Sequence, residues 1–130
     1  MNVSPGLTAS DSYLRATPEV IAMFVNGCGP GGWKFDLIPD TMLGLSVTEA
    51  CNIHDWDYTE GKTQADKEAA DERFLANCRA LIDNAPGIIN RLLRYHRRLR
   101  ALEYYEAVKH FGDEAFWAGK DRPDQKGDHP

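Results

Sequence analysis

Long apolar segments, cysteine pairs and strand-like alternation are all scarce in this chain of 130 residues. No apolar run approaches the ~20 residues of a membrane-spanning helix, which argues against an integral membrane protein. Only three cysteines are present, and an odd count allows either one disulfide with one thiol or three thiols. The net charge of -5 and a pI near 5.3 argue against the general electrostatic attraction that drives non-specific nucleic-acid binding.

Several familiar sequence signatures are also missing. The glycine-rich segment 27–32 lacks the lysine and the serine or threonine of a phosphate-binding loop. The cysteines form no C-x-x-C pair, and His54 is the only histidine near them, which argues against a zinc domain. The first 15 residues show no basic region followed by an apolar region, so no secretory signal is visible and the compartment stays open.

What is present predicts one all-α domain. The chain is long enough to bury a core without disulfides, and helical patterns cover most of it, whereas strand signals are almost absent. We expect a single helical domain over residues 1–119 and a polar, flexible tail over residues 120–130, which holds two prolines and a glycine.

Four helices and one short turn are expected. Thr17-Pro18-Glu19 is a helix start with a cap, a first-position proline and an early acid, and this helix ends at Asn26-Gly27. Ser46 and Glu49 have the spacing of a capping box, which opens a helix running to about Tyr58. Long helices are expected over 63–83 and 88–111, and Phe116 and Trp117 pack back as a short turn after Gly112.

Two helices carry polar residues on faces that should be buried. Cys51, His54 and Tyr58 recur at spacings of three and four, so they share one face. In the next helix Asp71 lies on an apolar stripe, where a carboxylate is costly unless it is paired. If the two helices pack antiparallel, His54 and Asp71 can meet, and the carboxylate would fix the tautomer of the imidazole.

A cation site is the second candidate feature. Asp55 follows His54, and the glycine-rich segment could turn several backbone carbonyls towards one point, as hard ions such as calcium prefer. Ordinary alternatives exist for each feature. A single histidine is usually a satisfied core residue, Asp71 could be an exposed acid near a helix start, and glycine-rich segments are most often turns.

Taken in order, these residues resemble the secreted phospholipase A2 superfamily in its bacterial or phage-like form. Cys28-Gly29-Pro30-Gly31-Gly32 is similar to the C-G-x-G-G calcium loop of that family. The stretch from Cys51 to Tyr58 is similar to its C-x-x-H-D-x-x-Y active-site helix. Asp71 matches the aspartate of the family's histidine–aspartate dyad more weakly, because Asp66 is a rival five residues earlier. The likeness covers residues 20–82.

The resemblance implies a function and a set of roles. His54 would deprotonate the water that attacks the sn-2 ester of a glycerophospholipid, Asp71 would orient His54, and Tyr58 would support the pair. Calcium (Ca2+) would be the cofactor, held by Asp55 and by the backbone carbonyls of Gly27, Gly29 and Gly31. The expected partner is a phospholipid membrane surface, contacted peripherally, and no nucleic acid is expected. The alternative is a catalytically silent relative that only binds lipid or protein.

The chain departs from the family pattern in its cysteines and in showing no secretory signal. The resemblance implies a disulfide between Cys28 and Cys51, and Cys78 as an unpaired, buried thiol. Because bridges are missing and no signal is visible, secretion is in doubt, and a phage product or a toxin delivered without a signal would fit as well.

Two segments are candidates for membrane contact. Five arginines crowd residues 91–100 and could bind anionic headgroups, but such runs are more usually a solvated face that pairs with acids. An apolar rim beside the glycine-rich segment could instead admit an acyl chain, although it could equally be core. Its residues are Leu37, Ile38, Met42, Leu43 and Leu45.

Overall fold

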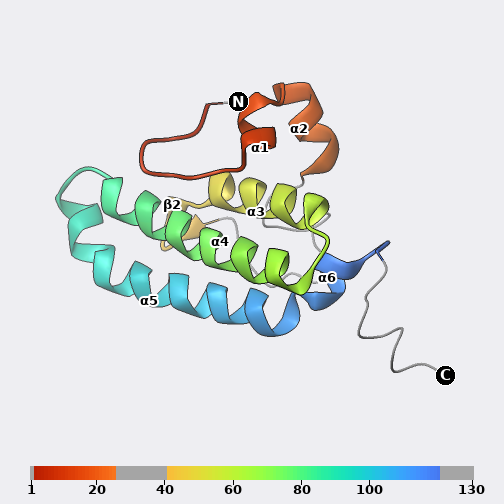
Figure 1. Cartoon of the computed structure of the whole chain (residues 1–130). Coiled ribbons are helices and arrows are strands. Elements are labelled where there is room, and N and C mark those ends of the chain that lie inside the picture. Colours follow the sequence, from red (N-terminus) through yellow and green to blue (C-terminus); the bar gives the residue numbers. More distant parts are fainter. Residues whose placement is uncertain (1, 26–40, 121–130) are drawn as a thin grey trace.

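Three helices form the framework of the computed structural model, which describes residues 2–25 and 41–120. They are α3 (Thr48–Glu60), α4 (Gln64–Asn84) and α5 (Ile88–Phe111). Helix α4 packs against both of the others and runs antiparallel to each of them (Figure 1). The described part of the chain is therefore mostly helical, as the sequence predicts, and the expected bounds of these helices hold to within about two residues.

Two short helices cover the outer side of α3 (Figure 1). Helix α2 (Pro18–Phe24) begins as expected, because the Thr17 side chain accepts a hydrogen bond from the Val20 backbone N–H. Helix α1 (Asp11–Arg15) was not predicted, since the first 15 residues read as polar and turn-rich. It is capped in the same way, by the Ser10 side chain.

A two-stranded hairpin precedes α3, although strand signals are almost absent from the sequence. Strands β1 (Thr41–Met42) and β2 (Leu45–Ser46) pair antiparallel, with Met42 opposite Leu45. Leu43 and Gly44 have positive φ angles of 50° and 84°, which is the backbone of the two-residue turn that suits a tight hairpin.

The expected capping box at the start of α3 is wrong. The helix begins at Thr48 after Val47, and no side chain caps it. The Glu49 carboxylate does not reach back to Ser46, because it accepts a hydrogen bond of 2.8 Å from the backbone N–H of Ser4. Glu49 therefore ties the N-terminal segment to α3.

The main core lies where α4 meets α3 and α5. Side chains from all three helices, the hairpin and α6 (Asp113–Trp117) fill it, among them Met42, Tyr58, Phe74, Cys78, Ile82, Val108 and Phe116. A second cluster joins α1 and α2 to α3, and Trp56 is at its centre, with the rings of Tyr13 and Phe24 edge-on at 5.7 and 5.8 Å. Within the described ranges, no helix combines the length and the apolar character needed to cross a bilayer.

Helix α4 has the capping box that α3 lacks. The Asp66 backbone N–H donates to the Thr63 hydroxyl at 3.1 Å, and the Asp66 carboxylate accepts from the backbone N–H groups of Lys62 and Thr63 at 2.8 and 3.1 Å. The hydrogen bond from Lys62 N–H is the main cause that lowers the pKa of Asp66 below its ordinary 3.8. Asp66 thus stabilises the start of the helix that holds Asp71.

We predict that Asp66→Asn destabilises the protein by about 1 kcal/mol at pH 7. Because the folded protein lowers the pKa of Asp66, this contribution is complete above the unfolded value of 3.8 and is lost as the pH falls through the folded value. Urea unfolding should therefore show a difference from wild type at pH 7 that diminishes as the pH is lowered below 3.8. Glu68→Gln, an exposed change on the same helix, is the control and should leave the free energy of unfolding unchanged.

Candidate functional site

A buried carboxylate on α4 organises the candidate site. Asp71 is only 2% exposed, yet it accepts hydrogen bonds from three side chains. His54 Nε2 and Tyr58 Oη lie 2.8 and 2.6 Å from its Oδ1, and Lys67 Nζ lies 2.8 Å from its Oδ2. A carboxylate removed from water needs this degree of pairing to stay charged.

His54 occupies the position on α3 that faces Asp71. The expected hydrogen bond between the two side chains is present, across the interface of two antiparallel helices. His54 is buried, and its ring lies against those of Tyr58 and Phe74, with centroids 4.2 and 4.9 Å away. Since Nε2 donates to a carboxylate, the neutral ring carries its lone pair on Nδ1, which is the nitrogen that could accept a proton.

Tyr58 follows His54 by one helical turn and donates to the same Asp71 oxygen. Burial and the Asp71 carboxylate both raise the pKa of Tyr58, so its hydroxyl stays protonated and remains a donor. The space for this hydroxyl depends on Gly112, where an added Cβ would collide with Tyr58 Oη and with the Val108 carbonyl. The glycine that ends α5 therefore also makes room for the hydrogen bond to Asp71.

Lys67 is the functional candidate that sequence reasoning missed. It is 1% exposed and lies one turn before Asp71 on the same face of α4. Its ammonium also donates to the backbone carbonyls of Val108 and Lys109, at 3.1 and 3.3 Å, near the end of α5. The spacing of four residues to Asp71 was visible in the sequence, but lysine is so rarely buried that spacing alone did not single it out.

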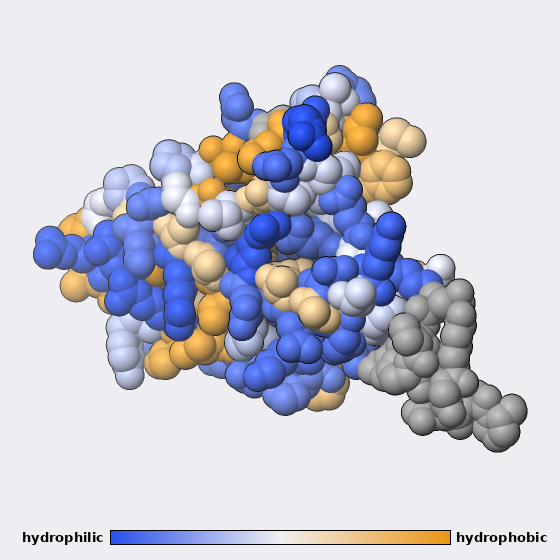
Figure 2. Space-filling model, viewed as in Figure 1, coloured by the Kyte–Doolittle hydropathy of each residue, from blue (hydrophilic) through white to orange (hydrophobic). Residues whose placement is uncertain are grey.

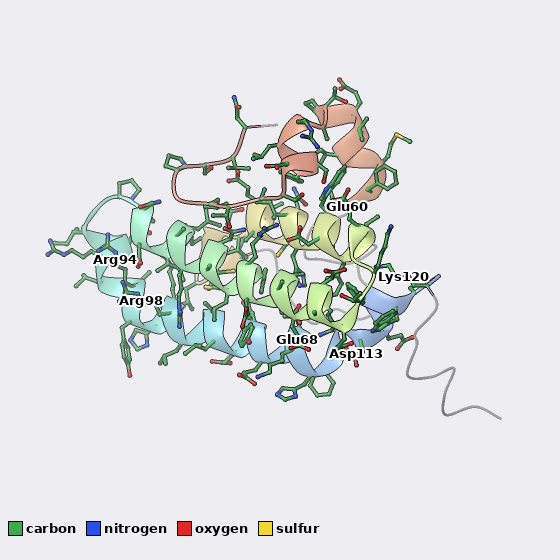
Figure 3. All side chains as sticks on the ribbon, viewed as in Figure 1. Glu60, Glu68, Arg94, Arg98, Asp113 and Lys120 are labelled. Atoms are coloured by element: carbon green, nitrogen blue, oxygen red, sulfur yellow. The ribbon has the colours of Figure 1, made fainter. Side chains whose placement is uncertain are left out.

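Lys67 also joins the site to α6. Its Nζ lies 3.5 Å from Oδ1 of Asp113, the first residue of that helix, which Figure 3 labels at this end of the bundle. One ammonium group thus meets a buried carboxylate, two carbonyls at a helix C-terminus and a half-exposed carboxylate. Every one of these groups favours a positive charge.

The electrostatics favour an ionised Asp71 beside a neutral His54. Burial raises the pKa of Asp71, but the hydrogen bonds from His54, Lys67 and Tyr58 together hold it below its ordinary value. The pKa of His54 is lowered, first by burial and also by the positive charge of Lys67, although Asp71 opposes this. A neutral imidazole beside a carboxylate is the pairing that a general base requires.

Asp71, and not Asp66, is the carboxylate that contacts His54. Asp66 is exposed and bonded to the backbone at the start of α4, whereas Asp71 is buried and bonded to His54. The catalytic roles expected for His54, Asp71 and Tyr58 remain predictions.

Asp55 is the one expected calcium ligand within the described residues. It is half-buried on α3, and its carboxylate has the oxygen chemistry that suits this ion. The other expected ligands, Gly27, Gly29 and Gly31, lie outside the described residues. Residues 2–25 and 41–120 contain no group of three or more histidine, cysteine or acidic side chains that could hold a metal ion. A site of one carboxylate and three backbone carbonyls would not form such a group.

Two of the three cysteines can be assigned. Cys51 is disulfide-bonded, and the Cys28 that was expected as its partner lies outside the described residues. Cys78 is a free, buried thiol, as expected, and burial raises its pKa to about 12. Cys78 is therefore a core residue and not a reactive thiol at neutral pH.

The apolar rim and the arginine-rich segment, the two candidates for membrane contact, are partly buried. Met42 is fully buried and belongs to the core, Leu43 is exposed, and Leu37 and Ile38 lie outside the described residues. Arg97 is buried, with its guanidinium bonded to the Met42 and Leu43 carbonyls. Arg98 pairs with Asp83 at 2.6 Å, as expected for an arginine that meets an acid on its surface.

A second polar contact joins α3 and α4 near the site. Arg73 donates to both carboxylate oxygens of Asp57, at 3.0 and 3.2 Å. Burial raises the pKa of Asp57 to about 6, with a smaller contribution from Glu60, while Arg73 opposes the rise. This pair lines a polar hollow of about 240 Å³ together with Glu60, Gly61 and Asp66. This pair was not predicted from the sequence.

Comparison with known proteins adds no assignment. No family model, no curated protein and no solved structure matches this chain.

We predict that Lys67→Met destabilises the protein by about 3 kcal/mol, because it leaves the Asp71 carboxylate and two carbonyls without their buried cation. Urea unfolding at pH 7 measures this. Lys109→Met, an exposed lysine on α5, is the matched control and should change the free energy of unfolding by less than about 0.5 kcal/mol.

A double substitution separates the lost pairing from lost packing. If the main cost of Lys67→Met is an unpaired carboxylate, then Lys67→Met with Asp71→Asn should cost less than the sum of the two single changes. Strict additivity of the two free-energy changes would contradict the ion pair as the cause.

Proposed function

We propose that this protein hydrolyses the sn-2 ester of glycerophospholipids in a calcium-dependent reaction. The observation that carries the proposal is the buried hydrogen bond between His54 Nε2 and Asp71 Oδ1, at 2.8 Å, with Tyr58 and Lys67 completing the shell of the carboxylate. The order of the glycine-rich segment, of Cys51, His54, Asp55 and Tyr58 on one helix, and of Asp71 on the next supports it through the resemblance to the phospholipase A2 superfamily.

His54 is assigned the role of general base. Its Nδ1 takes a proton from water while the water oxygen bonds to the ester carbonyl carbon. The protonated ring then returns the proton to the glycerol oxygen as the bond between carbonyl carbon and that oxygen breaks. The products are a free fatty acid and a lysophospholipid, and no covalent intermediate with the protein forms.

Asp71 and Tyr58 position this base. The Asp71 carboxylate holds the proton on Nε2, so that Nδ1 keeps its lone pair, and it stabilises the imidazolium when that forms. Tyr58 and Lys67 restrain the carboxylate from the sides that His54 does not occupy. The hydrogen bond from Lys67 helps to keep the Asp71 carboxylate ionised. The positive charge of Lys67 also adds to the effect of burial in lowering the pKa of His54.

Calcium is proposed as the cofactor, held by Asp55 and the backbone carbonyls of Gly27, Gly29 and Gly31. When bound, the ion would supply positive charge for the ester oxygen that becomes negative during the reaction.

The test is release of fatty acid from vesicles of mixed phosphatidylcholine and phosphatidylglycerol, with calcium and then with a chelator. We expect release from the sn-2 position that chelation abolishes. His54→Gln and Asp71→Asn should each reduce the rate about 100-fold or more, since they remove the base or its orientation. Asp55→Asn should reduce calcium affinity and activity together.

Matched controls make the assignment specific. His110→Gln changes an exposed histidine on α5, and Asp66→Asn changes the rival carboxylate on α4. Both should retain the wild-type rate. Equal loss in Asp66→Asn and Asp71→Asn would contradict the role given to Asp71. Calcium binding by a folded protein that releases no fatty acid from these vesicles would favour a silent binding module over an enzyme.

A further inference from the structure

The outward face of α5 exposes large apolar side chains. Ile88, Leu92 and Tyr95 are 72%, 68% and 67% exposed, and their spacings of four and three place them on one face. Leu99 and Leu102 continue the same row and are less exposed. The row lies opposite the buried face of α5, which Arg97, Ala101 and Val108 form, so it points away from α4.

Basic charge is concentrated beside this row. From Asn84 to Leu102 the sequence holds five arginines and no acid, although the chain as a whole has a net charge of -5. Arg91 and Arg98 follow one edge of the row, and Arg94 lies next to them. Figure 3 shows Arg94 and Arg98 reaching outward from the end of the bundle where α4 passes into α5.

The contacts of these arginines leave the region positive. Arg97 is used internally, and Arg98 pairs with Asp83, whose backbone carbonyl also accepts from Arg94 at 3.0 Å. A hollow of about 480 Å³, lined by Gly87, Ile88, Arg91 and Arg94, places guanidinium groups directly beside apolar surface. Figure 2 shows such neighbouring hydrophilic and hydrophobic areas along the lower side of the molecule, over α5.

We propose that this face of α5 docks on anionic phospholipid bilayers. Ile88, Leu92 and Tyr95 would enter the boundary between headgroups and acyl chains, while Arg91 and Arg94 contact lipid phosphates. An acidic protein is repelled by an anionic bilayer over most of its surface, so a basic, apolar face also fixes its orientation. The inference extends the proposed function by naming the surface that meets lipid.

Charge favours a bilayer over a second copy of the chain. The acids that a second copy would offer to these arginines are Glu103 and Glu106 on the same helix, and both are already paired, with Arg100 and His110. An anionic bilayer supplies a dense array of phosphates for the same groups. The other exposed apolar patch, formed by Val20, Met23 and Phe24 on α2, has no basic side chain within that helix.

The test measures binding without hydrolysis. Ether-linked lipids have no ester to cleave, so co-sedimentation with ether-linked phosphatidylglycerol and phosphatidylcholine vesicles, in chelator, reports docking alone. We expect binding to the anionic vesicles, at least about tenfold weaker binding to phosphatidylcholine alone, and loss of binding in high salt. Failure here would leave the hydrolysis assay of the proposed function unaffected, and the reverse also holds.

Paired substitutions locate the surface. Leu92→Ser should weaken binding about tenfold through lost apolar burial, and Arg91→Gln about fivefold through one lost phosphate contact. The matched controls Met23→Ser and Arg15→Gln, which change an exposed methionine and an exposed arginine elsewhere, should bind as wild type. Absent wild-type binding, or loss in Met23→Ser but not in Leu92→Ser, would overturn the proposal. A wild-type dimer in solution that Leu92→Ser converts to a monomer would also overturn it, because a second copy would then cover the face.

Discussion

The Asp71 carboxylate is the constraint on which the rest of the fold depends. A charge held at 2% exposure must be met by donors from every side, and here these come from His54 and Tyr58 on α3 and from Lys67 on α4. Lys67 in turn holds the end of α5 and the first residue of α6. One buried ion pair thus positions four helices. Removing only one partner of such a pair destabilises a protein far more than replacing both partners with apolar residues.

The same arrangement sets a balance between structure and chemistry. Burial lowers the pKa of His54, and the positive charge of Lys67 lowers it further, while the Asp71 carboxylate opposes both effects. In exchange, Asp71 stays ionised and immobile, so the imidazole keeps one tautomer and one orientation. For the proposed role of His54 as general base, the geometry therefore favours a fixed ring orientation over a high basicity.

The sequence predicted most where local rules dominate. Pro18, Gly61 and Gly112 mark helix ends because backbone chemistry decides them, and an acid on an apolar stripe pointed to a buried partner for Asp71. Prediction from the sequence failed where contacts between residues far apart in the chain determine the structure. Lys67 was missed because only the end of α5 makes its burial tolerable. The supposed cap by Glu49 failed because Ser4 competes for it, and no pattern reveals a partner 45 residues away.

The order of the helices limits how the molecule can meet a flat surface. Helices α3 and α4 lie between α2 on one side and α5 on the other (Figure 1). The exposed row on α5 points away from α4, and the apolar patch on α2 lies beyond α3, so one bilayer cannot contact both. Charge distinguishes the two faces, because arginines accompany the row on α5, whereas α2 contains Glu19 and no basic residue. The proposed orientation on an anionic bilayer thus follows from where the chain places its arginines, and not from total apolar area.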